Sequence, residues 1–188
     1  MKTLIYLHGL GSSAASRKFV SLKEVFGSKY NVVCPEWTYK TSIRVMLGNL
    51  SRQYENEKSI IIIGSSTGGN FAYQLRERLR LDGVKVKLIL INPLLHLEQR
   101  TSQRTFPSNL EGYMSEIKEV KDCSLILSNE DEAIDHSLIS RGENVKAINI
   151  DDNHRVKNVM KLMWIIKRII KKKRSCKKDS IVVKITIR

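Results

Sequence analysis

A glycine-serine pattern near the middle of the chain contains residue types that can carry out nucleophilic chemistry. Residues 64–68 read Gly-Ser-Ser-Thr-Gly, with Ser66 at the centre of a G-x-S-x-G pattern. Four isoleucines at residues 60–63 precede it and are typical of a buried strand. Such a turn takes the chain from strand to helix within a few residues and exposes the central hydroxyl. The pattern predicts that Ser66 is a nucleophile for acyl transfer, whereas Ser65 lies one place off the turn.

A histidine late in the chain is placed to act as the base that this serine needs. His154 comes after a strand-like run at residues 146–150 and before a helical pattern. Of the four histidines, only His154 follows the last predicted strand. The other three lack that position: His8, His96 and His136. We therefore predict that His154 is the general base that takes the Ser66 proton.

An acidic residue between the serine and the histidine completes the set. Asp131 comes soon after an apolar run at residues 124–128. A carboxylate in this role fixes the imidazole tautomer and stabilises the imidazolium formed after proton abstraction. We predict Asp131 in the role, although a turn could instead present one of three nearby acids: Glu130, Glu132 and Asp135. Asp151 and Asp152 are expected to shape the loop that carries His154.

A second glycine-containing loop predicts the site of charge stabilisation. Residues 3–7 read as a buried strand that runs into His8, Gly9 and Leu10. Acyl transfer places negative charge on a carbonyl oxygen, and fixed backbone N–H groups stabilise it. We predict that the amides of Leu10 and Thr67 form this oxyanion hole. His8 itself is expected to be structural.

The elements that must position these residues alternate between strands and helices along the chain, as in doubly wound folds. Strands are predicted at residues 3–7, 30–34, 59–63, 86–91, 124–128 and 146–150. Helices are predicted at residues 16–26, 42–54, 69–81, 110–120, 134–141 and 156–171. The irregular polar segment at residues 94–107 could form at most a small lid. The prediction is an α/β fold with about six mainly parallel strands, flanked by helices, with its site at the carboxyl ends of the strands.

The chain resembles the α/β-hydrolase superfamily and, within it, the small esterase-like family typified by the YqiA proteins. The order of serine, acid and histidine is the α/β-hydrolase order. The resemblance spans residues 1 to about 170, and five segments carry it: residues 6–9 followed by Ser12 and Ser13, residues 64–69, Asn92 with Pro93, residues 131–135 and residues 152–155. It implies a compact serine esterase without a cap that hydrolyses small acyl esters.

Length, charge and composition are consistent with one compact domain and a basic end. The chain has 188 residues, 41% of them hydrophobic, and a net charge of +14. Residues 161–188 hold eleven Lys or Arg against the single acid Asp179, so they carry +10 of that charge. We predict a hydrolase domain at residues 1–170 and a basic tail at residues 171–188. We expect the last helix to cover the sheet with its apolar face and the basic tail after it to be solvated. The alternative is that this end contacts nucleic acid or an anionic membrane surface as a weak partner.

Other classes of protein find less support. No apolar run is long enough to cross a bilayer and the chain begins with a strand, so a cytoplasmic protein is expected. The three cysteines lack C-x-x-C spacing, and no metal or organic cofactor is implied. The predicted reaction is hydrolysis of an ester through an acyl-enzyme, although thioesters and amides fit the same residues. The alternative is a non-catalytic protein of this fold whose basic end binds nucleic acid or membrane. The sequence predicts no oligomeric state.

Overall fold

A parallel sheet of six strands forms the centre of the molecule. The structure is a computed structural model that describes residues 1–103 and 105–172. The strand order is β2-β1-β3-β4-β6-β8, and every neighbouring pair is parallel. The strands are β1 (Lys2–Leu7), β2 (Tyr30–Val33), β3 (Ser59–Ser65), β4 (Lys85–Ile91), β6 (Cys123–Glu130) and β8 (Lys146–Asn153). The chain reverses its direction of strand addition between β1 and β3, which is where open α/β sheets collect functional groups.

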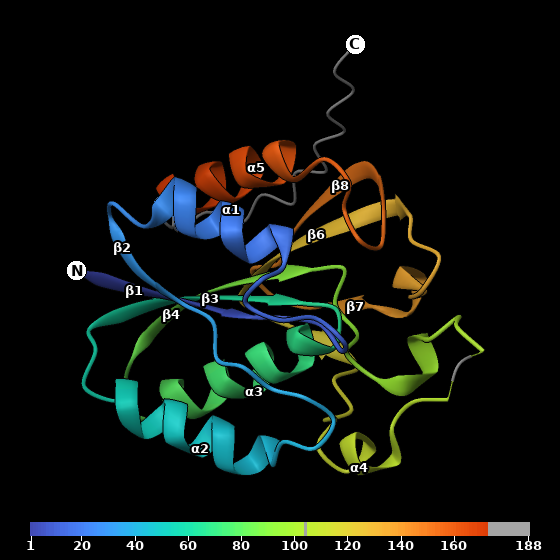
Figure 1. The fold of residues 1–188 in the computed structure, drawn as a ribbon, viewed down its shortest axis with the longest axis horizontal. Coiled ribbons are helices and arrows are strands. Elements are labelled where there is room, and N and C mark those ends of the chain that lie inside the picture. Colours follow the sequence, from blue (N-terminus) through green and yellow to red (C-terminus); the bar gives the residue numbers. More distant parts are fainter. Residues whose placement is uncertain (104, 173–188) are drawn as a thin grey trace.

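Helices cover both faces of this sheet (Figure 1). One layer contains α1 (Arg17–Phe26) and α5 (Val159–Lys171), and the other contains α2 (Ile43–Tyr54) and α3 (Thr67–Leu81). Successive side chains of a strand point to opposite faces, so the isoleucines of β3 divide between two cores. Ile60 and Ile62 pack in the core with α2 and α3, and Ile61 and Ile63 in the core with α1 and α5. The predicted α/β fold is confirmed.

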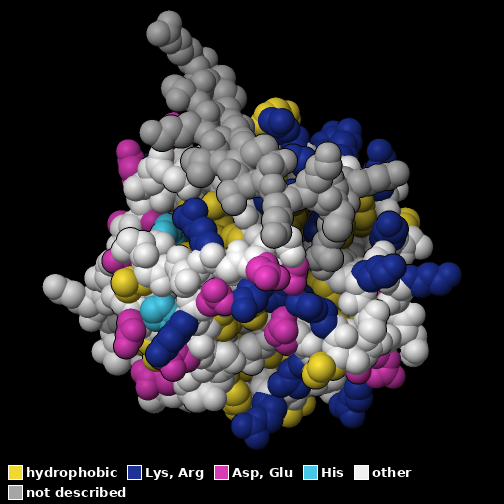
Figure 2. All heavy atoms as spheres, turned by 180° about the vertical axis from the view of Figure 1, so that it is seen from behind, with side chains coloured by type: hydrophobic (Ala, Val, Ile, Leu, Met, Phe, Trp, Pro, Cys, Tyr) yellow, Lys and Arg dark blue, Asp and Glu magenta, His cyan; other side chains and the backbone are white. Residues whose placement is uncertain are grey.

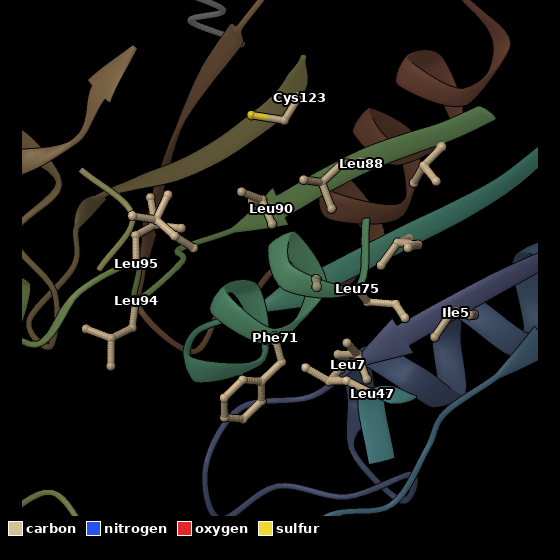
Figure 3. Packing of buried hydrophobic residues seen from close by; sticks show 14 of the residues in the cluster. Ile5, Leu7, Leu47, Phe71, Leu75, Leu88, Leu90, Leu94, Leu95 and Cys123 are labelled. Carbon is tan, nitrogen blue, oxygen red and sulfur yellow. The ribbon is translucent and has the colours of Figure 1, made fainter. Parts of the chain in front are cut away.

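The core on the α2 and α3 side anchors the helix that follows Ser66. Phe71 and Leu75 of α3 are fully buried. They lie among side chains from α2, β1 and β4, including Leu47, Leu7 and Leu90 (Figure 3). Burying a side chain of this size contributes about 1.5–3 kcal/mol. The beginning of α3 is therefore fixed against the carboxyl ends of the strands.

Two of the six predicted helices are wrong. Residues 110–120 contain only the end of α4 (Ser108–Glu111) and then β5 (Glu119–Val120), because the side chain of Asn70 holds the backbone N–H and carbonyl of Ser115. Residues 134–141 contain the 3-10 turn η2 (His136–Leu138) and β7 (Ser140–Arg141), which pairs with β5. Here the Asp135 side chain accepts from the Ser137 amide, a local bond that competes with helix formation.

Smaller differences concern the ends of elements. The last helix, α5, begins three residues later than predicted, because Val156 has a φ of 56° and Asn158 caps the helix through the Lys161 amide. The segment at residues 94–107 contributes the short turn η1 (Leu97–Gln99) and buried side chains such as Leu95 and Phe106. It therefore packs on the domain more than a purely polar lid would.

Most of the predicted basic tail lies outside the residues that the structure describes. Of residues 171–188, the structure describes Lys171, which ends α5, and Lys172, whereas residues 173–188 lie outside the described residues. Within the described part of the chain, no helix is both long and apolar enough to cross a membrane.

Candidate active site

Ser66 stands on a sharp turn between β3 and α3. Its backbone has a φ of 54° and a ψ of −128°, a conformation that residues other than glycine rarely adopt. The turn is held by hydrogen bonds from the Ser66 amide to the Ile91 carbonyl (3.0 Å) and from the Leu94 amide to the Ser66 carbonyl (3.0 Å). Hydrogen bonds to strand β4 and to the residues after it therefore hold the strained backbone of Ser66 in place.

The flanking glycines let the backbone pass closely enough to form this turn. A side chain at Gly68 would collide with the carbonyl oxygens of Leu7 and His8 at the end of β1. A Cβ at Gly64 would lie 2.6 Å from the Gly68 carbonyl oxygen. These contacts give a physical reason for glycine at both ends of the G-x-S-x-G pattern.

The structure brings the three predicted residues together. Nε2 of His154 lies 3.0 Å from Oγ of Ser66, and Nδ1 of His154 lies 2.9 Å and 3.0 Å from the two oxygens of Asp131. An ionised carboxylate can only accept, so Nδ1 of His154 donates to it. Nε2 is then free of a proton and accepts from the Ser66 hydroxyl. This is the tautomer that a serine nucleophile requires.

The Asp131 carboxyl group is buried and ionised. Its side chain is 2% exposed. Burial raises the pKa of Asp131, but hydrogen bonds from His136, from His154 and from the Ala133 amide outweigh that effect and hold the pKa well below its ordinary value. A negative charge therefore faces His154 at neutral pH.

The rival residues have other partners. Ser65 is buried, and its hydroxyl lies 3.4 Å from Nζ of Lys18. Glu132 accepts from the backbone N–H of His154 at 3.1 Å, so it holds the loop that carries this histidine. Asp135 accepts from Ser137, as described above. Asp152 accepts from three backbone amides of its own loop, as expected for a residue that shapes it: Asn153, Lys157 and Asn158.

The loop after β1 runs beside the serine. A Cβ built on Gly9 would lie 3.0 Å from Cβ of Ser66 and 3.6 Å from its Oγ. The ring of His8 is buried and stacks on Trp37 with centroids 5.0 Å apart, which is consistent with the structural role expected for it. Thr67 is the first residue of α3, where backbone N–H groups have no acceptor within the helix. The amides of Leu10 and Thr67 thus belong to segments that flank Ser66.

Two residues contact this group without having been predicted to do so. Asn92, at the end of β4, bonds the Ser128 amide at 2.8 Å and the His154 carbonyl at 3.0 Å, so it ties together the strand ends that carry Asp131 and His154. His136 places Nε2 2.8 Å from Oδ2 of Asp131. In the sequence, Asn92 was marked by its position after a strand and by its place in a segment of the family resemblance, although no role was predicted for it, and His136 had no such signal.

A groove on the surface lies elsewhere. Its volume is about 670 Å³, and it is lined by α1 and the start of α5, with Arg17, Val20, Lys157 and Met160 among its residues. It includes none of the three residues that meet at Ser66.

Comparison with known proteins places the chain in a family. Residues 3–109 match the sequence model of UPF0227, described as an uncharacterised protein family. The chain belongs to this family. The range that matches UPF0227 includes Ser66 and the loop after β1, whereas Asp131 and His154 lie beyond it. No curated protein compared with the chain matches it.

Solved structures share the fold of this UPF0227 member at low identity. A Xanthomonas campestris pv. campestris protein assigned to the alpha/beta superfamily of hydrolases is 17% identical, with a TM-score of 0.59 over 90% of this chain and 98% of its own. Est1E from Butyrivibrio proteoclasticus is 14% identical, with a TM-score of 0.60 over 91% and 89%. The RedJ thioesterase of Streptomyces coelicolor is 9% identical, with a TM-score of 0.61 over 89% and 85%. The fold is that of the α/β-hydrolase superfamily, as predicted.

Proposed function

We propose that the chain is a serine hydrolase that cleaves small carboxylic esters by acyl transfer to water. One observation carries the proposal: the imidazole of His154 lies between Ser66 Oγ, at 3.0 Å, and the Asp131 carboxylate, at 2.9 Å. A serine next to a base that is itself oriented by a third group is the arrangement of an activated nucleophile.

In the first half of the reaction, Nε2 of His154 takes the Ser66 proton as Oγ bonds to the ester carbonyl carbon. The electron pair of the carbonyl moves onto its oxygen, which the amides of Leu10 and Thr67 stabilise. The bond to the alcohol then breaks, and His154 returns the proton to the departing alkoxide. An acyl-enzyme on Ser66 remains.

Water completes the cycle through the same groups. His154 takes a proton from water as its oxygen bonds to the acyl carbon, and the oxyanion forms again. The bond to Oγ breaks, His154 returns the proton to Ser66, and the free acid leaves. Asp131 keeps the imidazole in one tautomer and stabilises the imidazolium in both halves.

The choice of an ester is supported by the fold and by the absence of a large cap in the described residues. Proteins of similar fold include Est1E, which has been solved with ferulic acid bound, and the RedJ thioesterase, and these properties belong to those proteins. The segment at residues 94–107 packs against the core and contributes only the short turn η1 within its described part. We infer an open site that accepts small acyl groups.

Hydrolysis of a chromogenic short-chain ester tests the proposal. The wild type should release the alcohol steadily, and Ser66→Ala should lower kcat by several orders of magnitude because it removes the nucleophile. Equal rates for the two proteins would contradict the proposal. No turnover in either, together with binding of polyanions, would favour the alternative, a non-catalytic protein of this fold.

A further inference from the structure

Two imidazoles contact the carboxylate of Asp131. Nε2 of His136 lies 2.8 Å from Oδ2, the same oxygen that lies 2.9 Å from Nδ1 of His154. The side chain of His136 is 12% exposed and that of Asp131 is 2% exposed. Water has little access to this contact, so His136 is a principal partner of the carboxylate.

The chemistry of the carboxylate fixes which nitrogen of each ring carries a proton. Because an ionised carboxylate only accepts, His136 must donate to Asp131 through Nε2. Nδ1 of His136 is buried and has no hydrogen-bond partner within residues 1–103 and 105–172. Within the described residues, the hydrogen bond of the His136 ring is therefore the one from Nε2 to Asp131.

The backbone around His136 is fixed, so the ring is held in place. The Asp135 carboxylate accepts from the Ser137 amide at 2.9 Å and begins the turn η2. The Asp135 amide donates to the carbonyl of the buried Gln99 at 2.7 Å, and Ile134 forms a bridge with Arg100. The loop that presents Asp131 therefore also presents a second histidine to it.

We propose that His136 is a positioning residue of the Ser66, His154 and Asp131 group. It holds the Asp131 carboxylate in the orientation that faces His154, and it shares the oxygen that His154 uses. This inference rests on the proposed function. The N–H dipole of His136 weakens the negative potential that Asp131 exerts at His154. His136 on Oδ2, together with the Ala133 and Ile134 amides on Oδ1, also keeps the carboxylate from rotating away.

Replacement of His136 tests both effects. His136→Leu removes the donor, so kcat should fall about tenfold with KM unchanged, and the acid limb of the kcat/KM profile should move up by about half a pH unit. His136→Gln keeps an N–H donor at a similar reach and should restore both values toward those of the wild type. A fully active His136→Leu with an unchanged pH profile would overturn the proposal.

Nitrogen NMR shows which ring nitrogen of each histidine carries a proton, so it tests the contact between His136 and Asp131 without a variant and without turnover. At neutral pH, His136 of the wild type should carry its proton on Nε2 and His154 on Nδ1. A proton on Nδ1 of His136 would overturn the proposal, and this measurement decides the matter if His136→Leu does not fold. A wild type that shows the expected tautomers but does not hydrolyse esters would contradict the proposed function and leave the His136 contact established.

Discussion

The backbone of Ser66 is strained, but its side chain is an ordinary hydroxyl and a weak nucleophile by itself. Its reactivity must therefore come from the groups that surround it. The hydroxyl has His154 at 3.0 Å, and the imidazole has the buried Asp131 carboxylate behind it. The positive φ of Ser66 points its hydroxyl out of the strand and toward that imidazole. The tautomer of His154, and with it the reactivity of Ser66, depends on Asp131 being an acceptor only.

Asp131→Asn should lower kcat by about 10³–10⁴ and leave KM nearly unchanged, because an amide can donate to His154 and favour the wrong tautomer. Steady-state kinetics on a short-chain ester measure both values. Glu130→Gln is the matched control, since it makes the same change at the neighbouring exposed end of β6. Equal losses in the two variants would contradict the role of Asp131.

The same carboxylate predicts how stability depends on pH. Burial raises the pKa of Asp131, but the bonds from His136 and His154 hold it below its ordinary value of 3.8. Its contribution to stability is therefore complete above a pH of about 4 and is lost as the pH falls through the folded-state pKa. Urea unfolding of the wild type and Asp131→Asn should show a stability difference that is largest near neutral pH and shrinks in acid. A difference that grows in acid would count against this.

At the scale of elements, convergence depends on how closely the strand ends and the start of α3 approach one another. Ser66 follows β3, Asp131 follows β6 and His154 follows β8, and Asn92 at the end of β4 bonds to the carbonyl of His154. The backbone of α3 passes against the end of β1 at Gly68. Any group added there must move one of the elements.

Gly68→Ala should destabilise the protein by about 1–3 kcal/mol, because the added methyl meets the backbone carbonyl oxygens of Leu7 and His8. Gly48→Ala, within α2, is the control: nothing lies within 4 Å of its Cβ, so stability should rise by about 0.5–1 kcal/mol. Thermal and urea unfolding compare the two. A Gly68→Ala protein as stable as the wild type would show that α3 does not depend on this contact.

The sheet could be predicted because its strands are long apolar runs separated by helical patterns. The isoleucines of β3 are buried on both faces, and such runs have few alternatives. Residues 110–120 and 134–141 were wrongly predicted as helices because side-chain bonds decide their conformation. Asn70, 45 residues earlier in the chain, holds Ser115, and hydrophobic periodicity in the sequence does not reveal that contact.

Part of the site could be predicted for a similar reason. Ser66, Asp131 and His154 follow strands, and the carboxyl ends of parallel strands meet at one edge of the sheet. His136 does not follow a strand of the main sheet. It reaches Asp131 because the loop after β6 folds into the turn η2, and that turn depends on Asp135 and on the distant Gln99.

At the scale of the whole molecule, the charge is divided between a mixed surface and a basic end. Figure 2 shows Lys and Arg side chains interspersed with Asp and Glu over one face. The segment from Lys161 onward carries +10 of the net +14. On α5, Met160 is 68% exposed and Trp164 is 47% exposed, with the Arg168 guanidinium over the indole ring. Basic and apolar groups therefore share the outer side of α5.

We propose that this end binds polyanions weakly. The full chain should be retained on DNA-cellulose at low salt and released as salt rises, since the contacts would be with phosphates. Truncation after Lys172 removes six Lys or Arg and one acid, should reduce retention, and keeps the contacts of the Lys87 ammonium with the end of α5. Ester hydrolysis should not change. Retention that does not depend on salt concentration, or that is unchanged by the truncation, would contradict the proposal.

Labelling with a fluorophosphonate shows whether Ser66 is activated, because the reagent reacts with a serine only where a base and an oxyanion site activate it. Mass spectrometry of the digested protein then identifies the modified residue. We expect one phosphonylated peptide that contains Ser66, and we expect this label to be lost in Ser66→Ala and His154→Ala. An unlabelled wild type, or a label on Ser65 or another serine, would show that Ser66 is not the activated nucleophile.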